Sequence, residues 1–106
     1  MIQQTEQGIE LKFETPVNVA DLVTRINKEL GFTSHVSVDL DLSRHGPRVI
    51  VAGNRGLHNS YGYSIILNHA PEQNTPMEDV TSRNLTFPCM VGYDDLKKVH
   101  DQLVIQ

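Results

Sequence analysis

The sequence predicts an α+β fold in which two amphipathic helices cover one face of a mainly antiparallel sheet of four to five strands. Two kinds of spacing carry this prediction. Several segments alternate apolar and polar residues with a period of two, as strands with one buried face require, and two other segments space their apolar residues as a helix does. The expected order of elements is β-α-β-β-β-(β)-α, arranged as a two-layer sandwich.

Residues 8–15 predict the first strand, because apolar residues alternate there with charged ones. A helix is expected next. Asn18 is a favoured side-chain cap at its start, and Gly31 is a favoured residue at its end. Between them the apolar residues form one stripe, made of Leu22, Val23, Ile26 and Leu30.

Residues 36–42, 48–52 and 61–69 predict three strands joined as an antiparallel meander. Consecutive turns of a meander lie at opposite ends of the sheet, so the turns after the first and second of these strands are expected to lie apart. In the first strand we expect a common core face formed by Val36, Val38, Leu40 and Leu42. In the third we expect one formed by Tyr61, Tyr63, Ile65 and Leu67.

Residues 70–83 predict a long polar loop, held by Met77 and Val80 in a short helical turn. Residues 84–89 are a candidate for a final strand. The last helix is expected to start with Asp94 as its cap. Its buried stripe is expected to contain Leu96, Val99 and Leu103.

Length and composition favour a single domain over residues 1–106 that acts in the cytoplasm. The sequence shows neither a signal peptide nor an apolar run long enough for a membrane span, so we expect no membrane partner. The formal charge is −4 and the 9 Lys and Arg residues are scattered, so we expect no duplex nucleic acid partner. The single cysteine, Cys89, has no disulfide partner in the chain and is expected to be a buried, inert thiol.

Two turns gather side chains that suit an anionic, nucleotide-like ligand, because they combine guanidinium, imidazole and amide groups. The turn after the first meander strand carries Arg44, His45 and Arg48. The turn after the second carries Asn54, Arg55, His58, Asn59 and Tyr61, together with glycines that permit close backbone approach. Since these turns lie at opposite ends of the sheet, a joint site would need two subunits.

No nucleophile motif, zinc spacing or phosphate-binding loop is present, so we expect no catalytic residue, metal or cofactor. The leading hypothesis is a non-enzymatic binding protein that acts on a protein partner, as a homo-oligomer, through the uncovered sheet face, an edge strand or the 70–83 loop. Its basis is the surplus of apolar strand residues such as Ile66 on that face. The alternatives are a binder of a small anionic ligand and a small enzyme with a His/Asp site at a subunit junction.

Overall fold

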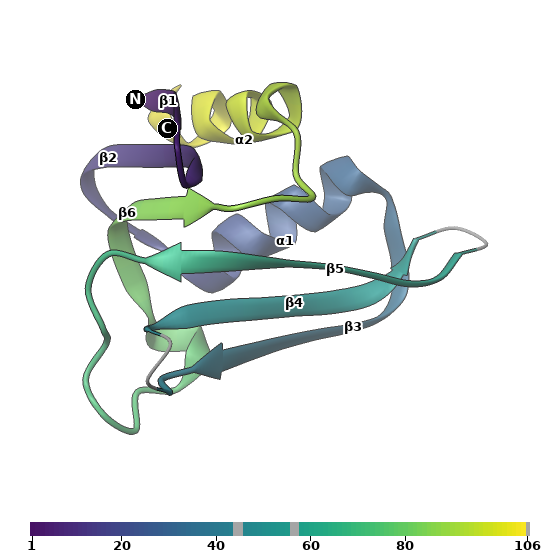
Figure 1. The fold of residues 1–106 in the computed structure, drawn as a ribbon, viewed down its shortest axis with the longest axis horizontal. Helices are drawn as coiled ribbons and strands as arrows, with labels where there is room; N and C mark the ends of the chain where they lie inside the picture. Colours follow the sequence, from purple (N-terminus) through teal and green to yellow (C-terminus); the bar gives the residue numbers. More distant parts are fainter. Residues whose placement is uncertain (44–45, 56–57, 106) are drawn as a thin grey trace.

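The computed structural model describes residues 1–43, 46–55 and 58–105, with the backbone alone for 33–35, 55, 58–60 and 105. These residues form two helices and one antiparallel sheet with the strand order β1-β2-β6-β5-β4-β3 (Figure 1). The elements are β1 (Ile2–Thr5), β2 (Gly8–Asn18), α1 (Val19–Leu30), β3 (Phe32–Asp41), β4 (Arg48–Arg55), β5 (His58–Leu67), the short 3-10 helix η1 (Met77–Asp79), β6 (Thr81–Phe87) and α2 (Tyr93–Ile105).

The α+β class is confirmed, but the expected number of four to five strands is wrong, because the described residues form six. The missed strand is β1, which pairs with β2 from Ile2↔Leu11 to Thr5↔Gly8. Its segment is almost entirely polar and so lacks the alternation that reveals a strand in a sequence. The sequence indicated residues 84–89 only as a candidate strand. The structure contains this strand as β6, which starts earlier than residue 84.

Helix α1 begins and ends as its sequence predicts. The Asn18 side chain accepts a hydrogen bond from the Asp21 backbone N–H at 2.9 Å, which satisfies one of the free donors of the first turn. Gly31 closes the helix in the left-handed conformation with φ 80°. Helix α2 differs slightly, since it begins at Tyr93 and Asp94 lies within its first turn.

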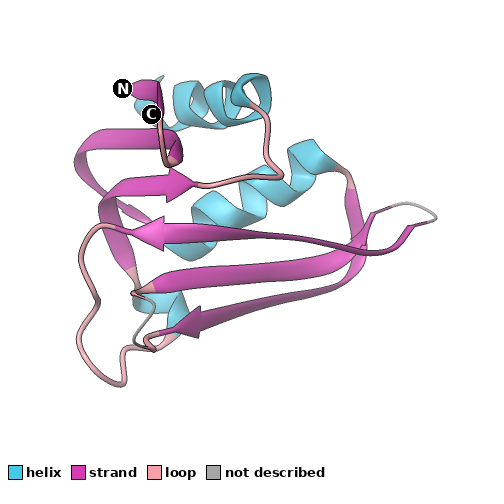
Figure 2. Ribbon diagram, in the orientation of Figure 1, coloured by secondary structure: helices cyan, strands magenta, loops and turns pink. Residues whose placement is uncertain are grey.

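Both helices pack their apolar stripes against the same face of the sheet (Figure 2). This inner face is the one that carries the buried residues of the strands, among them Leu11, Val49, Val51, Tyr63, Ile65, Leu85 and Phe87. The core contains a buried polar contact, in which the Tyr63 hydroxyl donates to Asn27 Oδ1 on α1 at 2.6 Å. No helix among the described residues has the length and apolar composition needed to cross a bilayer.

Strands β3, β4 and β5 form the predicted antiparallel meander. Val38 and Leu40 pair with the buried Val51 and Val49 and pack at the edge of the core. Val36, in contrast, is 44% exposed, because the β3–β4 register shifts between Ser34 and Ser37. Leu42 is also 44% exposed, since β3 ends at Asp41. The expectation that all four apolar residues of β3 share the core face is therefore wrong for Val36 and Leu42.

A large bulge interrupts β2 where it crosses β6. Lys12 pairs with Asn84 and the next pair is Val17↔Ser82, so residues 13–16 lie opposite the single residue Arg83. Pro16 lies in this bulge, where the absence of its N–H costs no ladder hydrogen bond. The bulge bends β2 sharply, and the bend is visible in Figure 1.

Replacement of Gly8 by alanine is expected to destabilise the protein by at least about 2 kcal/mol. Gly8 has φ 135°, and a Cβ there would lie 2.2 Å from the Phe87 carbonyl oxygen. Gly31→Ala is the matched control, because φ is also positive there but no atom lies within 4 Å, and a cost of only about 1 kcal/mol is expected. Chemical denaturation measures both values, and an equal loss in the two variants would contradict the predicted clash.

Tyr63→Phe is expected to lower the free energy of unfolding by about 1 kcal/mol at neutral pH, because Asn27 Oδ1 loses its donor. Burial raises the pKa of the Tyr63 hydroxyl, and the nearby Tyr61 adds to the increase. The folded state therefore resists ionisation of Tyr63 at a pH where the unfolded chain ionises, and stability falls as the pH rises above about 10. Unfolding curves across that range should show a steeper loss for the native protein than for Tyr63→Phe, and parallel losses would refute the assignment.

Candidate functional site

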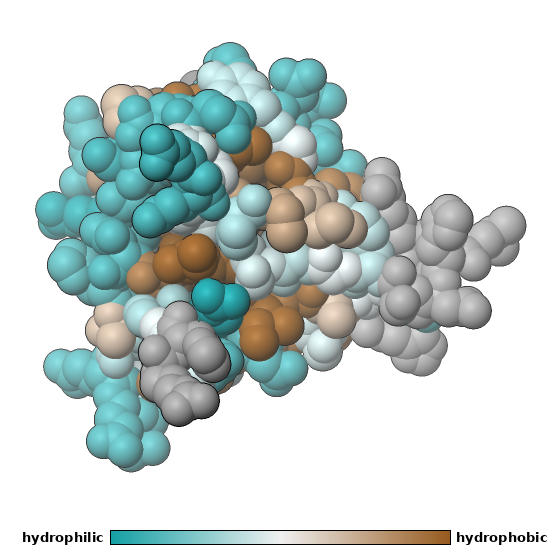
Figure 3. Space-filling view, viewed as in Figure 1, coloured by the Kyte–Doolittle hydropathy of each residue, from teal (hydrophilic) through white to brown (hydrophobic). Residues whose placement is uncertain are grey.

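The sheet face that turns away from the helices, here called the outer face, carries an apolar centre on β4 and β5. The cross-strand pairs Arg48↔Ile66, Ile50↔Ser64 and Ala52↔Gly62 alternate with the buried pairs, so their side chains point outward. Ile50 is 41% exposed. Figure 3 views the molecule from this side and shows hydrophobic residues at the surface over β4 and β5.

The segment after β6 lies over one end of this apolar centre. Cys89 and Met90 line an open hollow of about 360 Å³, together with Arg48, Ile50, Val51, Ala52, Gly62, Tyr63 and Ser64. Met90 is 55% exposed and adopts φ 74°, a conformation that costs a non-glycine residue about 1–2 kcal/mol. The Tyr61 hydroxyl donates to the Met90 carbonyl oxygen and so helps to hold this turn.

Cys89 is exposed, which corrects the prediction of a buried thiol. The prediction assumed that the apolar strand continues as far as Cys89. The strand stops at Phe87, and Pro88 and the left-handed turn at Met90 direct the chain out of the sheet.

The residues proposed as anion contacts fall at the two ends of β4. Arg48 starts the strand and Asn54 lies near its other end, about 20 Å away at the usual strand rise. Tyr61 is half-buried, and its ring packs edge-to-face on Phe32 at 5.5 Å between centroids. Arg44 and His45 lie outside the described residues. For Arg55, His58 and Asn59 the structure describes the backbone alone.

A cavity that the sequence did not predict lies between the β2 bulge and α2. Its volume is about 510 Å³, and it is lined by Met1, Lys12, Phe13, Glu14, Thr15, Val17, His100, Leu103 and Val104. His100 is only 8% exposed and stacks on Phe13 with 5.2 Å between ring centroids. His100 lies four residues after the buried Leu96 and so on the same side of α2, but the bulge that completes this cavity gives no sequence signal.

Both ring nitrogens of His100 have partners. The Met1 nitrogen lies 2.8 Å from Nε2, and the Asp101 carboxylate lies 3.2 Å from Nδ1. An ammonium nitrogen can only donate, so Nε2 accepts and Nδ1 carries the proton that faces Asp101. Hydrogen bonds from Lys97 and then from His100 hold the pKa of Asp101 below its usual range. In this arrangement His100 joins Met1, the residue before β1, to α2.

The chain finds no match among protein-family models, curated proteins or solved structures. In the part of the chain that the structure describes, no three His, Cys, Asp or Glu side chains gather in a way that could hold a metal ion.

His100→Phe is expected to preserve the packing on Phe13 and to remove both hydrogen bonds. A loss of about 1–2 kcal/mol in the free energy of unfolding follows, with faster amide exchange in β1, because β1 loses its link to α2. Lys98→Gln on the exposed side of the same helix is the control. Native-like exchange of β1 in His100→Phe would show that the histidine does not hold this strand.

Proposed function

We propose that the protein is a non-enzymatic binding module whose outer face docks on a protein partner, and that the partner is a second copy of the same chain. The observation that carries the proposal is the exposure of Ile50 and Met90 on one face. Large apolar side chains that share an exposed patch are typical of interaction surfaces.

A second copy is favoured by the pattern of charge and shape on this face. A two-fold axis needs only one self-complementary patch, and two-fold dimers are the commonest assemblies of soluble proteins. The outer face carries both signs of charge. Asp39 pairs with Ile50 across β3–β4, and Arg48 lies two residues before Ile50 on β4, on the same side of the sheet. A two-fold contact can therefore place Arg48 of each copy near Asp39 of the partner subunit, while Ile50 and Met90 are buried at the centre of the contact.

A cytoplasmic location belongs to the same proposal. Cys89 is unpaired and exposed, and such thiols persist in reducing compartments. If the outer face forms the dimer contact, Cys89 lies inside it, since it lines the same hollow as Ile50.

Ile50→Lys is expected to abolish dimerisation, because it places a charge at the centre of a desolvated apolar contact. Val104→Lys is the matched control, since Val104 is 60% exposed on α2 and lies away from the outer face. Light scattering coupled to size-exclusion chromatography, at micromolar and submillimolar concentration, measures the oligomeric state. The native protein and Val104→Lys should be dimeric, and Ile50→Lys should be monomeric.

Modification of Cys89 by a thiol reagent gives an independent measurement. The rate should fall as the native protein is concentrated and should stay constant for Ile50→Lys. A native protein that is monomeric throughout would sink the self-association proposal. A dimer that persists in Ile50→Lys would instead place the contact elsewhere, at the β3 edge or the 70–83 loop, and exclude the outer face.

A further inference from the structure

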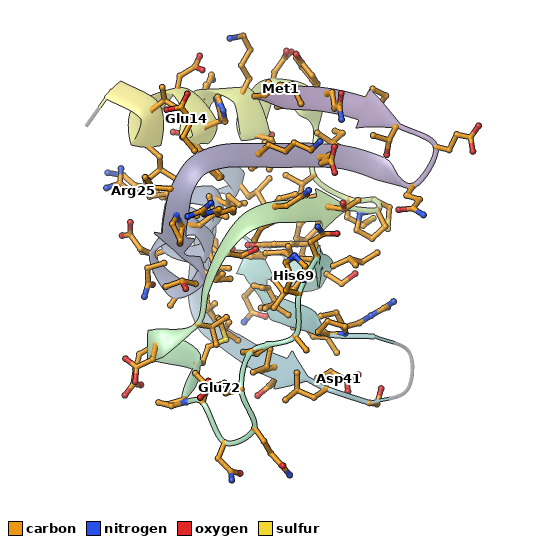
Figure 4. The ribbon with its side chains drawn as sticks, turned by 90° about the vertical axis from the view of Figure 1, so that its left-hand side faces the viewer. Met1, Glu14, Arg25, Asp41, His69 and Glu72 are labelled. Atoms are coloured by element: carbon orange, nitrogen blue, oxygen red, sulfur yellow. The ribbon has the colours of Figure 1, made fainter. Side chains whose placement is uncertain are left out.

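A small polar cavity lies at the end of the sheet where β5 finishes and β6 starts. Its volume is about 310 Å³, and it is lined by Pro16, Asn68, His69, Thr81, Ser82, Arg83 and Asn84. Figure 4 looks onto this side of the molecule and shows His69 beside the curved ribbon of β6. The cavity, called here the Arg83 cavity, shares no lining residue with the outer hollow.

The β2 bulge creates this cavity. Since residues 13–16 leave the ladder, Arg83 has no residue paired with it across the β2–β6 ladder. The walls are fixed by backbone contacts, because the Asn68 N–H donates to the Asn84 carbonyl at 3.3 Å. The Ser82 hydroxyl donates to the same carbonyl at 2.9 Å and accepts from the Asn84 N–H at 3.2 Å. The site is therefore built from the start of β6 and the first two loop residues after β5, of which Asn68 is tied to β6 through its backbone.

Among the described residues, the lining is rich in donors and contains no carboxylate. Within the described residues, neither the Arg83 guanidinium nor the His69 ring has a hydrogen-bond or ion-pair partner. Amide and hydroxyl groups of Asn68, Ser82 and Thr81 complete the lining. Glu72 and Asp41, the labelled acids nearest in Figure 4, lie below His69 on the neighbouring loop and strand.

We propose that the Arg83 cavity binds a small molecule through an oxyanion of the phosphate or carboxylate type. A guanidinium presents a planar pair of donors that matches either group, and the His69 imidazole, the Asn68 amide and the Thr81 hydroxyl supply further donors. The volume lies at the lower end of the range for small-molecule sites, which suits a compact anion better than a dinucleotide. This site is separate from the dimer contact proposed above.

Two-dimensional NMR titrations test the proposal directly. Inorganic phosphate and acetate are added separately to the native protein at constant ionic strength, and the His69 ring protons and the Ser82 and Arg83 amides are followed. Saturable shifts at millimolar anion, confined to the cavity, are expected. Saturation by phosphate alone identifies a phosphate-type ligand, and saturation by acetate identifies a carboxylate-type ligand.

The variants decide whether Arg83 carries the binding. Arg83→Gln should weaken the affinity at least about tenfold, and His69→Gln should weaken it to a smaller extent. Arg25→Gln is the control, because Arg25 lies on α1 and is ion-paired with Asp21 at 3.2 Å. Equal affinities for Arg83→Gln and Arg25→Gln, or no saturation by either anion, would overturn the proposal. Neither result would bear on the dimer, which is measured without anion.

Discussion

The whole structure depends on burial of one face of the β3–β5 meander. Val49, Val51, Tyr63 and Ile65 point toward the helices, and the residues between them point away. Because side chains alternate along a strand, a shift of one residue in the β4–β5 register would exchange the two faces. The same register that builds the core therefore also places Ile50 on the surface.

The second determinant is the bulge in β2, which organises the other half of the molecule. On the inner side it leaves the space between Phe13 and α2 in which His100 packs. The bulge also leaves Arg83 without a paired residue on β2 and contributes Pro16 to the cavity that contains His69. One irregularity thus contributes residues to two cavities.

Much of the fold could be predicted because regular spacing and capping residues report directly on local structure. The boundaries of α1 follow from Asn18 and Gly31, and the meander follows from alternation in β4 and β5. What the sequence could not reveal depends on contacts between distant segments. The polar strand β1 exists because β2 pairs with it and His100 contacts Met1 just before it, and the bulge exists because β6 fixes the register on both sides of it.

The residues of the candidate site divide in the same way, into those that local sequence patterns indicated and those that only contacts between distant segments bring together. Turn composition drew attention to Arg48 and Tyr61, whereas the structure gives the Tyr61 hydroxyl a partner in the Met90 carbonyl. Alternation predicted that Ile66 lies on the uncovered face, and the structure adds Ile50, which lies between two core residues of β4 and is exposed. Arg83 and His69 were not grouped, because Arg83 lies in β6 and His69 in the loop after β5, and the two residues meet only once the sheet has formed.

The join between β5 and β6 has a mechanical consequence. These strands pair at Ile66↔Thr86 and Leu67↔Leu85, at the end of β5, and the earlier part of β5 runs without β6 beside it. Side-chain packing beneath this short seam, more than backbone hydrogen bonding across it, therefore connects the two halves of the sheet. Helix α1 contacts both β2 and β3 and so connects the two halves of the sheet across the β5–β6 junction. Changes in the volume of its buried side chains will tilt one half of the sheet against the other while each half keeps its own register.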